Sequence, residues 1–254
     1  MILLDYSQIA LSNIIVQKLN DESMIRHMIL NSIRMYNKRY RDEYGQMVIC
    51  ADGMNTWRKD YYPYYKAKRK KNRDESSQDW NEIFRILHLV RDEIKENLPY
   101  KVVHMEGVEA DDIIASLVLQ SQEFGMNEPM MIVSSDKDFI QLQKFNNVKQ
   151  FSPIQKKFVK DDNPRTYLFN HIMKGDTGDG IPNVLSDDDT FVSDKKQTPL
   201  RKTRIAEWLE NSEDLRSVMP EEIFRNYQRN KKLIDLTEVP ESIQESIIYN
   251  YNEQ

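Results

Sequence analysis

The sequence is poor in the residues that build disulfides, cysteine metal sites and membrane spans. Its 254 residues include one cysteine, Cys50, which excludes a disulfide framework. Because Cys50 lies in the apolar run MVIC, we expect it in the core of a strand. No apolar run approaches the ~20 residues that cross a bilayer, and the N-terminal MILLDYS lacks the basic region and cleavage site of a signal peptide. These absences predict a soluble protein of a reducing cytoplasm.

Histidine is scarce as well. The four histidines are scattered along the chain, so each is interpreted as an ordinary core or surface residue. They are His27, His88, His104 and His171. Without a histidine or cysteine cluster, a zinc site is not expected. The sequence also shows no internal repeat and no low-complexity tract.

Short apolar runs alternate with helical patterns along the first two thirds of the chain. Such alternation predicts an α/β fold with a mostly parallel central sheet flanked by helices. Two further runs, NVKQFS and KKFVK, look like short edge strands, and the composition turns helical from about residue 163. The predicted strands are 1–5, 47–52, 100–105 and 130–136, and the predicted helices are 24–44, 80–98 and 108–124.

Acidic residues follow each predicted strand. Open α/β sheets bind ligands beyond the carboxyl ends of their strands, so these acids should converge on one edge. A single Asp after a strand is more often a turn or a helix cap, but four strand ends with acids form a stronger pattern. Converging carboxylates repel unless they bind divalent cations, and they suit Mg²⁺ or Mn²⁺ at a two-ion site for phosphoryl displacement. The acids are Asp5, Asp52, Glu109, Asp111, Asp112, Asp136 and Asp138, with Asp176 and Asp179 further on.

The net charge of −5 argues only weakly against nucleic acid, because the positive charges are gathered in one place. The stretch RKDYYPYYKAKRKKNR, residues 58–73, holds eight basic residues, one acid and four tyrosines. We call it the basic segment. It could be a solvated helix face, but tyrosines among cations are typical of single-strand nucleic-acid binding. In GDTGDGIPNV, residues 175–184, glycines permit a tight turn whose amides can face a phosphate or help bind a cation, or else an ordinary loop between helices.

The motifs VEADDIIA, IVSSDKDFIQL and KGDTGDGIPNV together resemble those of the structure-specific 5′ nucleases, the flap endonuclease family. Within that family the sequence is most similar to the ribonuclease H of T-even bacteriophages. The resemblance runs from LLDYSQIALS to the C-terminus, and YYKAKRKKNRDES resembles the helical arch of the family. It implies a nuclease core over residues 1–162, with the arch at about 55–78. A helical duplex-binding portion would follow over 163–254, with a helix–three-turn–helix motif at about 168–210.

The resemblance also implies a role for each matching residue. Asp5, Asp52, Glu109 and Asp111 would form a first metal site, and Asp136, Asp138, Asp176 and Asp179 a second, with Asp111 near both. Asp112 is either a further metal-site acid or a helix cap. Tyr65, Lys66 and Arg69 would hold the scissile phosphate as catalytic arch residues. Nucleic acid would also be contacted by Arg58, Lys59, Lys68, Lys70, Lys71, Arg73, Gly178, Gly180, Lys202 and Thr203.

One segment departs from the family pattern. Residues 185–198, which we call the acidic insertion, contain Asp187, Asp188 and Asp189 where the compact motif has a short glycine turn. We expect a mobile loop over 186–198. The insertion leaves open how the duplex is gripped, and whether K⁺ assists at the helix–three-turn–helix motif.

The resemblance therefore implies a 5′→3′ exonuclease and flap endonuclease with ribonuclease H activity, which needs two Mg²⁺ ions that Mn²⁺ can replace. It would remove RNA primers and adjacent DNA from lagging-strand fragments in phage-type replication. We expect a monomer without membrane contact, in the host cytoplasm if a phage encodes it. Its substrates would be DNA and RNA–DNA duplexes with 5′ flaps or ends, and a single-strand-binding protein or sliding clamp would be a partner. The alternatives are a non-catalytic 5′-junction-binding protein and a PIN-type ribonuclease.

Overall fold

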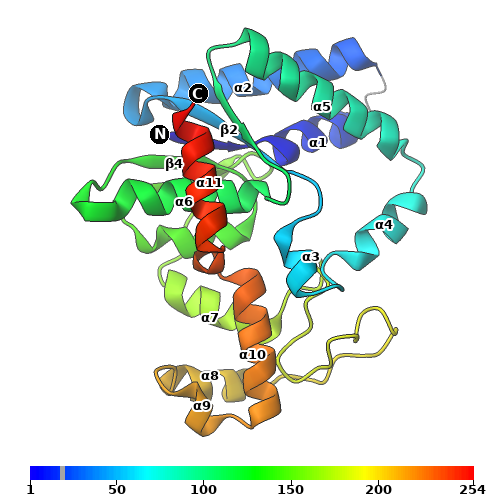
Figure 1. Cartoon of the computed structure of the whole chain (residues 1–254), viewed down its shortest axis with the longest axis vertical. Helices are drawn as coiled ribbons and strands as arrows, with labels where there is room; N and C mark the ends of the chain where they lie inside the picture. The colour runs from blue at the N-terminus through cyan, green and yellow to red at the C-terminus, as the bar shows by residue number, and fades with distance from the viewer. Residues whose placement is uncertain (18–20) are drawn as a thin grey trace. The chain divides into compact units, whose positions relative to one another are not determined.

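The computed structural model describes residues 1–17 and 21–254, which divide into two compact units (Figure 1). The first unit comprises Met1–Thr56, Asp79–Asp162 and Val239–Gln254. The second comprises Trp57–Gln78 and Asn163–Glu238. The basic segment therefore belongs to the same compact unit as the helical region that follows residue 162.

The first unit is built on a six-stranded sheet in the order β3-β2-β1-β4-β5-β6, in which β6 alone runs antiparallel to its neighbour. The four predicted strands are confirmed. The run NVKQFS was wrongly interpreted as an edge strand, because β5 pairs with β4 on one side and β6 on the other. The strands are β1 Ile2–Asp5, β2 Met47–Ala51, β3 Lys101–His104, β4 Met130–Val133, β5 Val148–Ser152 and β6 Lys157–Val159.

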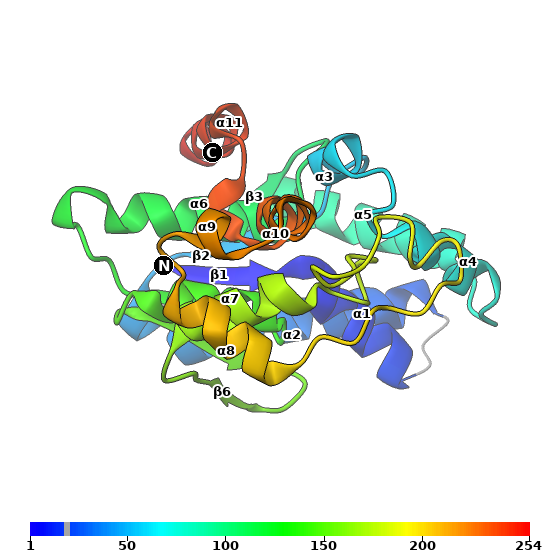
Figure 2. The same cartoon turned by 90° about the horizontal axis from the view of Figure 1, so that it is seen from below.

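Helices cover both faces of this sheet. Against one face pack α1 (Tyr6–Gln17), α2 (Glu22–Tyr44) and α5 (Trp80–Asn97), whose apolar residues share a core with β1 and β2. Against the other lie α6 (Ala110–Gln122) and α11 (Glu241–Asn252), which also contact each other (Figure 2). Cover on both faces explains why the strands are continuous apolar runs rather than alternating ones.

Local signals set the ends of the long helices. At the start of α2, Asp21 accepts a hydrogen bond from the main-chain N–H of Met24 at 2.8 Å, and Asp79 accepts one from Glu82 at the start of α5. After α2 the chain turns at Gly45, where φ is 77°. The three predicted helices of this unit are thus confirmed, with α6 shorter than predicted because it ends at Gln122 and a 3₁₀ turn, η1 (Glu123–Gly125), follows.

The second unit is helical. The basic segment forms two short helices, α3 and α4, and apolar residues of α7 and α10 build small cores with it and with α8. Among the residues that the structure describes, no helix combines the length and the apolarity needed to cross a bilayer. The helices are α3 Trp57–Tyr61, α4 Ala67–Asp74, α7 Pro164–Lys174, α8 Lys202–Glu210, α9 Leu215–Val218 and α10 Glu221–Ile234; short 3₁₀ helices η2 Lys137–Lys144 and η3 Leu236–Glu238 complete the two units.

Candidate metal centre and nucleic-acid interface

The carboxyl ends of β1 and β2 bring two acids together. The parallel register places Asp5 opposite Cys50, so Asp52 follows at the same edge of the sheet. Asp5 is 7% exposed. Burial, together with the nearby carboxylates of Asp52 and Asp136 and against the hydrogen bonds from Gln8 and Ser134, raises the pKa of the Asp5 carboxyl to about 7. The charge on Asp5 is therefore unfavourable in the protein without a cation.

The first turn of α6 adds the acids of EADD to this edge. The main-chain N–H of Ala110 donates to Asp52 Oδ1 at 2.8 Å, which ties the helix start to the end of β2. Asp111 is half-buried and lies near enough to Cys50 to help raise the pKa of that thiol, after burial and the charges of Asp5 and Asp52. Glu109 is 7% exposed at the N-cap. These contacts place Glu109 and Asp111 with the strand-end acids.

Asp112 has a different place. Its side chain is 0% exposed, and its Oδ2 accepts a hydrogen bond from the main-chain N–H of Glu109 at 3.0 Å. A carboxylate in the first turn is favoured both by this bond and by the helix dipole. The structure therefore shows the helix cap, and a role of Asp112 as a further metal-site acid stays a prediction.

The end of β4 completes the acidic edge. Ser134 donates its hydroxyl to Asp5 Oδ2 at 2.9 Å and accepts the main-chain N–H of Asp136 at 3.1 Å. Asp136 Oδ1 in turn accepts the N–H of Asp138 at 2.9 Å. Ser134 was not among the predicted site residues, because the predicted strand 130–136 included it whereas β4 ends at Val133.

The first unit therefore gathers six of the predicted acids, and the donor atoms that they offer are carboxylate oxygens. Such oxygens suit Mg²⁺ and Mn²⁺. The pKa of Asp5 is raised first by burial and then by Asp52 and Asp136, and a divalent cation would relieve the cost of its charge. The six are Asp5, Asp52, Glu109, Asp111, Asp136 and Asp138.

The second unit holds Asp176 and Asp179 in the turn after α7. His171 Nε2 lies 3.2 Å from Asp176 Oδ2, and this contact is the main cause that lowers the pKa of Asp176. The main-chain N–H of Asp179 donates to Asp176 Oδ1 at 3.0 Å. Gly175 is required here, because its φ is 67° and a Cβ would lie 2.2 Å from the carbonyl oxygen of Ile181. The sequence analysis interpreted His171 as an ordinary residue and missed this pair.

Asp179 joins the turn to the basic segment. Tyr65 donates its hydroxyl to Asp179 Oδ2 at 3.1 Å, Lys66 Nζ lies 3.6 Å from the same oxygen, and Arg69 forms an ion pair with Oδ1. The main-chain N–H of Lys66 also donates to the carbonyl of Asp179 at 2.8 Å. The three predicted catalytic arch residues therefore meet at one carboxylate.

The basic segment presents some of its predicted nucleic-acid contacts and buries others. Lys59, Lys68, Lys70 and Lys71 are exposed, and Arg73 is partly so. The predicted nucleic-acid contact of Arg58 is wrong. Arg58 is 2% exposed and donates through Nε to the carbonyl of Leu233 at 3.0 Å. Two of the four tyrosines, Tyr62 and Tyr65, are buried in the core of this unit and cannot offer open stacking faces.

The remaining predicted contacts lie around the turn and α8. Lys202 and Thr203 are exposed at the first two positions of α8, and Gly178 is exposed as well. Gly180 is buried instead. Its φ is 74° and a Cβ there would lie 3.0 Å from the carbonyl oxygen of Tyr64, so this glycine permits contact with the basic segment rather than with a phosphate.

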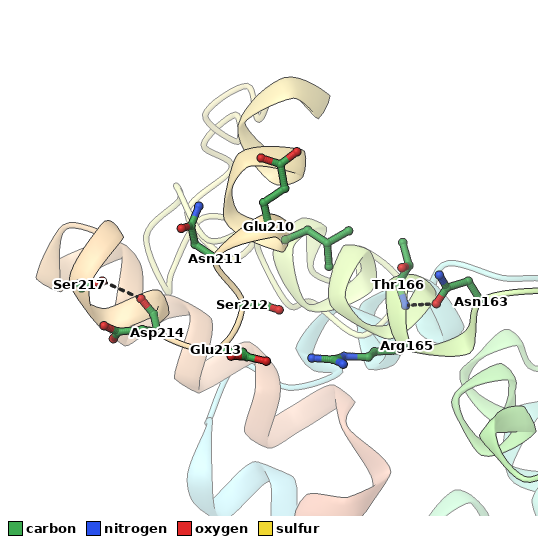
Figure 3. A pocket seen from close by; sticks show the side chains of 10 residues that line it. Asn163, Arg165, Thr166, Glu210, Asn211, Ser212, Glu213, Asp214 and Ser217 are labelled. Atoms are coloured by element: carbon green, nitrogen blue, oxygen red, sulfur yellow. Dashed lines mark hydrogen bonds between the residues drawn. The ribbon is translucent and has the colours of Figure 1, made fainter.

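A surface pocket of about 680 Å³ also lies in the second unit, between the start of α7 and the α8–α9 turn. Figure 3 shows the side chains of Arg165 and Glu213 pointing toward one another across it. Its polar lining contains none of the predicted site residues.

The fold and the acidic strand ends agree with the family matches. Residues 5–167 match the 5′-3′ exonuclease N-terminal, resolvase-like domain, and residues 163–254 match the C-terminal domain of T4 ribonuclease H. The chain belongs to the 5′-3′ exonuclease family. It is 38% identical over 262 residues to ribonuclease H of Enterobacteria phage T4, covering 98% of this chain and 85% of that protein. It is 27% identical to a 5′-3′ exonuclease of Buchnera aphidicola, covering 65% of this chain and 56% of that protein.

Solved structures show the same fold. The T5 5′-exonuclease with bound divalent zinc aligns with a TM-score of 0.68 and 16% identity, over 100% of this chain and 98% of that one. The T5 flap endonuclease in a complex with DNA and metal ions aligns with a TM-score of 0.68 and 17% identity, over 99% and 97%. At these identities the likeness confirms the resolvase-like fold of a 5′ nuclease and no more.

Proposed function

We propose that this protein is a Mg²⁺-dependent 5′→3′ exonuclease and flap endonuclease with ribonuclease H activity. It would remove RNA primers and adjacent DNA from lagging-strand fragments in phage-type replication. The observation that carries the proposal is the convergence of strand-end acids in the first unit, where burial and then the charges of Asp52 and Asp136 raise the pKa of Asp5. Membership of the exonuclease family and 38% identity to T4 ribonuclease H support the choice of nucleic acid as substrate.

In this proposal Asp5, Asp52, Glu109 and Asp111 hold a first Mg²⁺ ion, and Asp136 and Asp138 contribute to a second. Two bound ions supply an activated water and stabilise the leaving oxygen in an in-line displacement. The hydrogen bonds from Ser134 to Asp5 and from Ala110 to Asp52 fix the carboxylates in place before any ion binds. The resemblance adds Asp176 and Asp179 to the second set, which stays a prediction.

The basic segment would hold the substrate phosphate. Lys66 and Arg69 carry the positive charge, and their contacts with Asp179 orient them in advance. Tyr65 donates to the same carboxylate and so supports both cations rather than an open stacking face. The exposed Lys68, Lys70 and Lys71 would follow the strand that continues from that phosphate.

The helical region would grip the duplex. α7 and α8 are joined by residues 175–201, an arrangement that supports the helix–three-turn–helix proposed for about 168–210. The exposed Lys202 and Thr203 at the start of α8 would meet the phosphate backbone, since a helix N-terminus favours an anion. Functionally, residues 1–162 would be the nuclease core and 163–254 the duplex-binding portion.

A cleavage assay tests the proposal. A 5′-flap duplex, a nicked RNA–DNA hybrid and a plain single strand are compared with Mg²⁺ and with EDTA. We expect cleavage of the first two in Mg²⁺ and none in EDTA. Binding of the flap without cleavage would identify a junction-binding protein instead, and preferred cleavage of plain single-stranded RNA would identify a PIN-type ribonuclease.

A further inference from the structure

The acidic insertion is a folded element in this structure. Its two ends are tied together, because Asn183 donates through Nδ2 to the carbonyl of Thr198 at 2.8 Å and the N–H of Thr198 donates to Ser186 Oγ at 2.9 Å. Within the loop, Lys195 Nζ lies 2.9 Å from Asp189 and 3.3 Å from Asp187. The expected loop is present, but these bonds give it a defined conformation.

The middle acid of the insertion, Asp188, is held by α10. Arg229 and Arg225 both form ion pairs with Asp188, and Arg225 Nη2 lies 2.9 Å from Oδ1. The Arg229 side chain is only 7% exposed, and its Nη2 also donates to the carbonyl of Pro182 at 3.1 Å. A cation so far removed from water holds its carboxylate more firmly than a surface pair does.

The same insertion contacts the basic segment. Buried Tyr62 donates its hydroxyl to the main-chain carbonyl of Asp188 at 2.5 Å. Further along, Lys68 Nζ lies 3.7 Å from Asp194 Oδ1 and 5.9 Å from the ring centroid of Phe191. The insertion thus reaches the basic segment at two places, before α4 and on it.

We infer that the acidic insertion is a brace that positions the basic segment, with Asp188 as its anchor on Arg229 and Tyr62 as its contact with the segment. This rests on the proposed function, in which the basic segment holds a 5′ flap. The carboxylate of Asp188 is paired with Arg225 and Arg229, so its charge is offset and it does not repel substrate phosphates. Asp188 and Tyr62 are positioning residues that favour flapped substrates over substrates without a flap.

Trypsin tests the brace without any nuclease assay, because residues 58–73 contain eight cleavage sites. In Asp188→Ala and in Tyr62→Phe, cleavage within 58–73 should be faster than in the wild type by about 10-fold. Losing a hydrogen bond that involves a charged or buried group changes a local opening equilibrium by about that factor. Asp187→Ala is the matched control: it removes the same charge one residue away and leaves the Lys195–Asp189 pair intact. It should change cleavage by no more than about 2-fold, because exposed ion pairs contribute little to stability.

If neither Asp188→Ala nor Tyr62→Phe accelerates cleavage in 58–73, the brace does not exist. Equal acceleration at sites throughout the chain would also overturn it, because that pattern reports global unfolding. If Asp188→Ala fails to fold, the rate of trypsin cleavage within 58–73 is measured in Asp188→Asn and Tyr62→Phe instead, with the same expected result. The inference fails by this test whether or not the protein cleaves flaps.

Kinetics then test the functional part. On a 5′-flap duplex, Asp188→Ala should raise KM while kcat changes little, and KM on a nicked duplex without a flap should change less. An equal rise in KM on both substrates would contradict a role in flap selection. Absence of cleavage by the wild type would instead reject the proposed function and leave the trypsin result standing.

Discussion

Asp5, at a strand end of the first unit, has other acids as neighbours, whereas Asp176 and Asp179 of the second unit are paired with His171, Lys66 and Arg69. Burial, and after it the charges of Asp52 and Asp136, raises the pKa of Asp5 to about 7. Asp176 contacts His171 and its pKa falls, while Asp179 meets Lys66 and Arg69. The charge on Asp5 is therefore disfavoured, whereas Asp176 and Asp179 have paired side chains as neighbours. This difference indicates that a cation from solution is needed at the acidic edge that contains Asp5.

Removing the charge on Asp5 should have one of the largest effects. Asp5→Asn is expected to lower flap cleavage in Mg²⁺ by about 10²-fold or more, as losses of transition-state electrostatics do. In EDTA the same change should stabilise the protein at high pH. The folded pKa of about 7 exceeds the ordinary 3.8, so the contribution of Asp5 to stability is fully present below about pH 4 and is lost as pH rises through 7.

The difference between the folded pKa of Asp5 and its ordinary value corresponds to about 4 kcal/mol of unfolding free energy, which is an upper bound on the effect. Urea unfolding in EDTA at pH 5 and pH 8 measures the part of this effect that develops above pH 5. The measured quantity is the gain in unfolding free energy of the variant over the wild type. If that gain does not grow with pH, the charge on Asp5 is not disfavoured by its burial and its acidic neighbours.

Lys66 tests the paired acids of the second unit. Lys66→Ala should reduce kcat on a flap by about 10²- to 10³-fold, because a positioned cation would be lost from the transition state. Stability should change little, since Arg69 still pairs with Asp179. Lys38→Ala, an exposed lysine of α2 with the same charge change, is the control and should retain activity. Similar losses in both variants would mean that only the overall charge matters.

Asp112 separates a helix cap from a metal ligand. Asp112→Ala should lower the free energy of unfolding by about 1 kcal/mol, the usual cost of a lost cap, and leave the Mg²⁺ concentration for half-maximal cleavage nearly unchanged. Asp111→Ala should do the reverse, with a large rise in that concentration. A large rise for Asp112→Ala would return this residue to the ligand set.

The smallest expected effect concerns a single exposed cation of the basic segment. Plotting the logarithm of the flap-binding constant against that of the salt concentration should give a slope about 1 unit shallower for Lys70→Ala than for the wild type. Binding is measured in Ca²⁺ or EDTA to prevent cleavage. An unchanged slope would remove Lys70 from the interface.

The acidic edge could be predicted from the sequence because it depends on local rules. Parallel strands end together, so an acid after each strand implies a shared site without any knowledge of long-range packing. The errors arise where distant segments meet. Buried Arg58 donates a hydrogen bond to Leu233, 175 residues away, and buried Tyr62 donates one to Asp188, 126 residues away. A basic, tyrosine-rich stretch has the same sequence pattern whether its side chains face solvent or pack against a distant segment of the chain.

The role of Asp136 gives the most direct test of a metal-dependent nuclease built on the strand-end acids. Flap cleavage in Mg²⁺ and flap binding in EDTA are measured side by side for the wild type and Asp136→Asn. The account predicts that cleavage is abolished while the dissociation constant for the flap stays within about 3-fold, because the substitution leaves the basic segment intact. Cleavage at the wild-type rate by Asp136→Asn would contradict it.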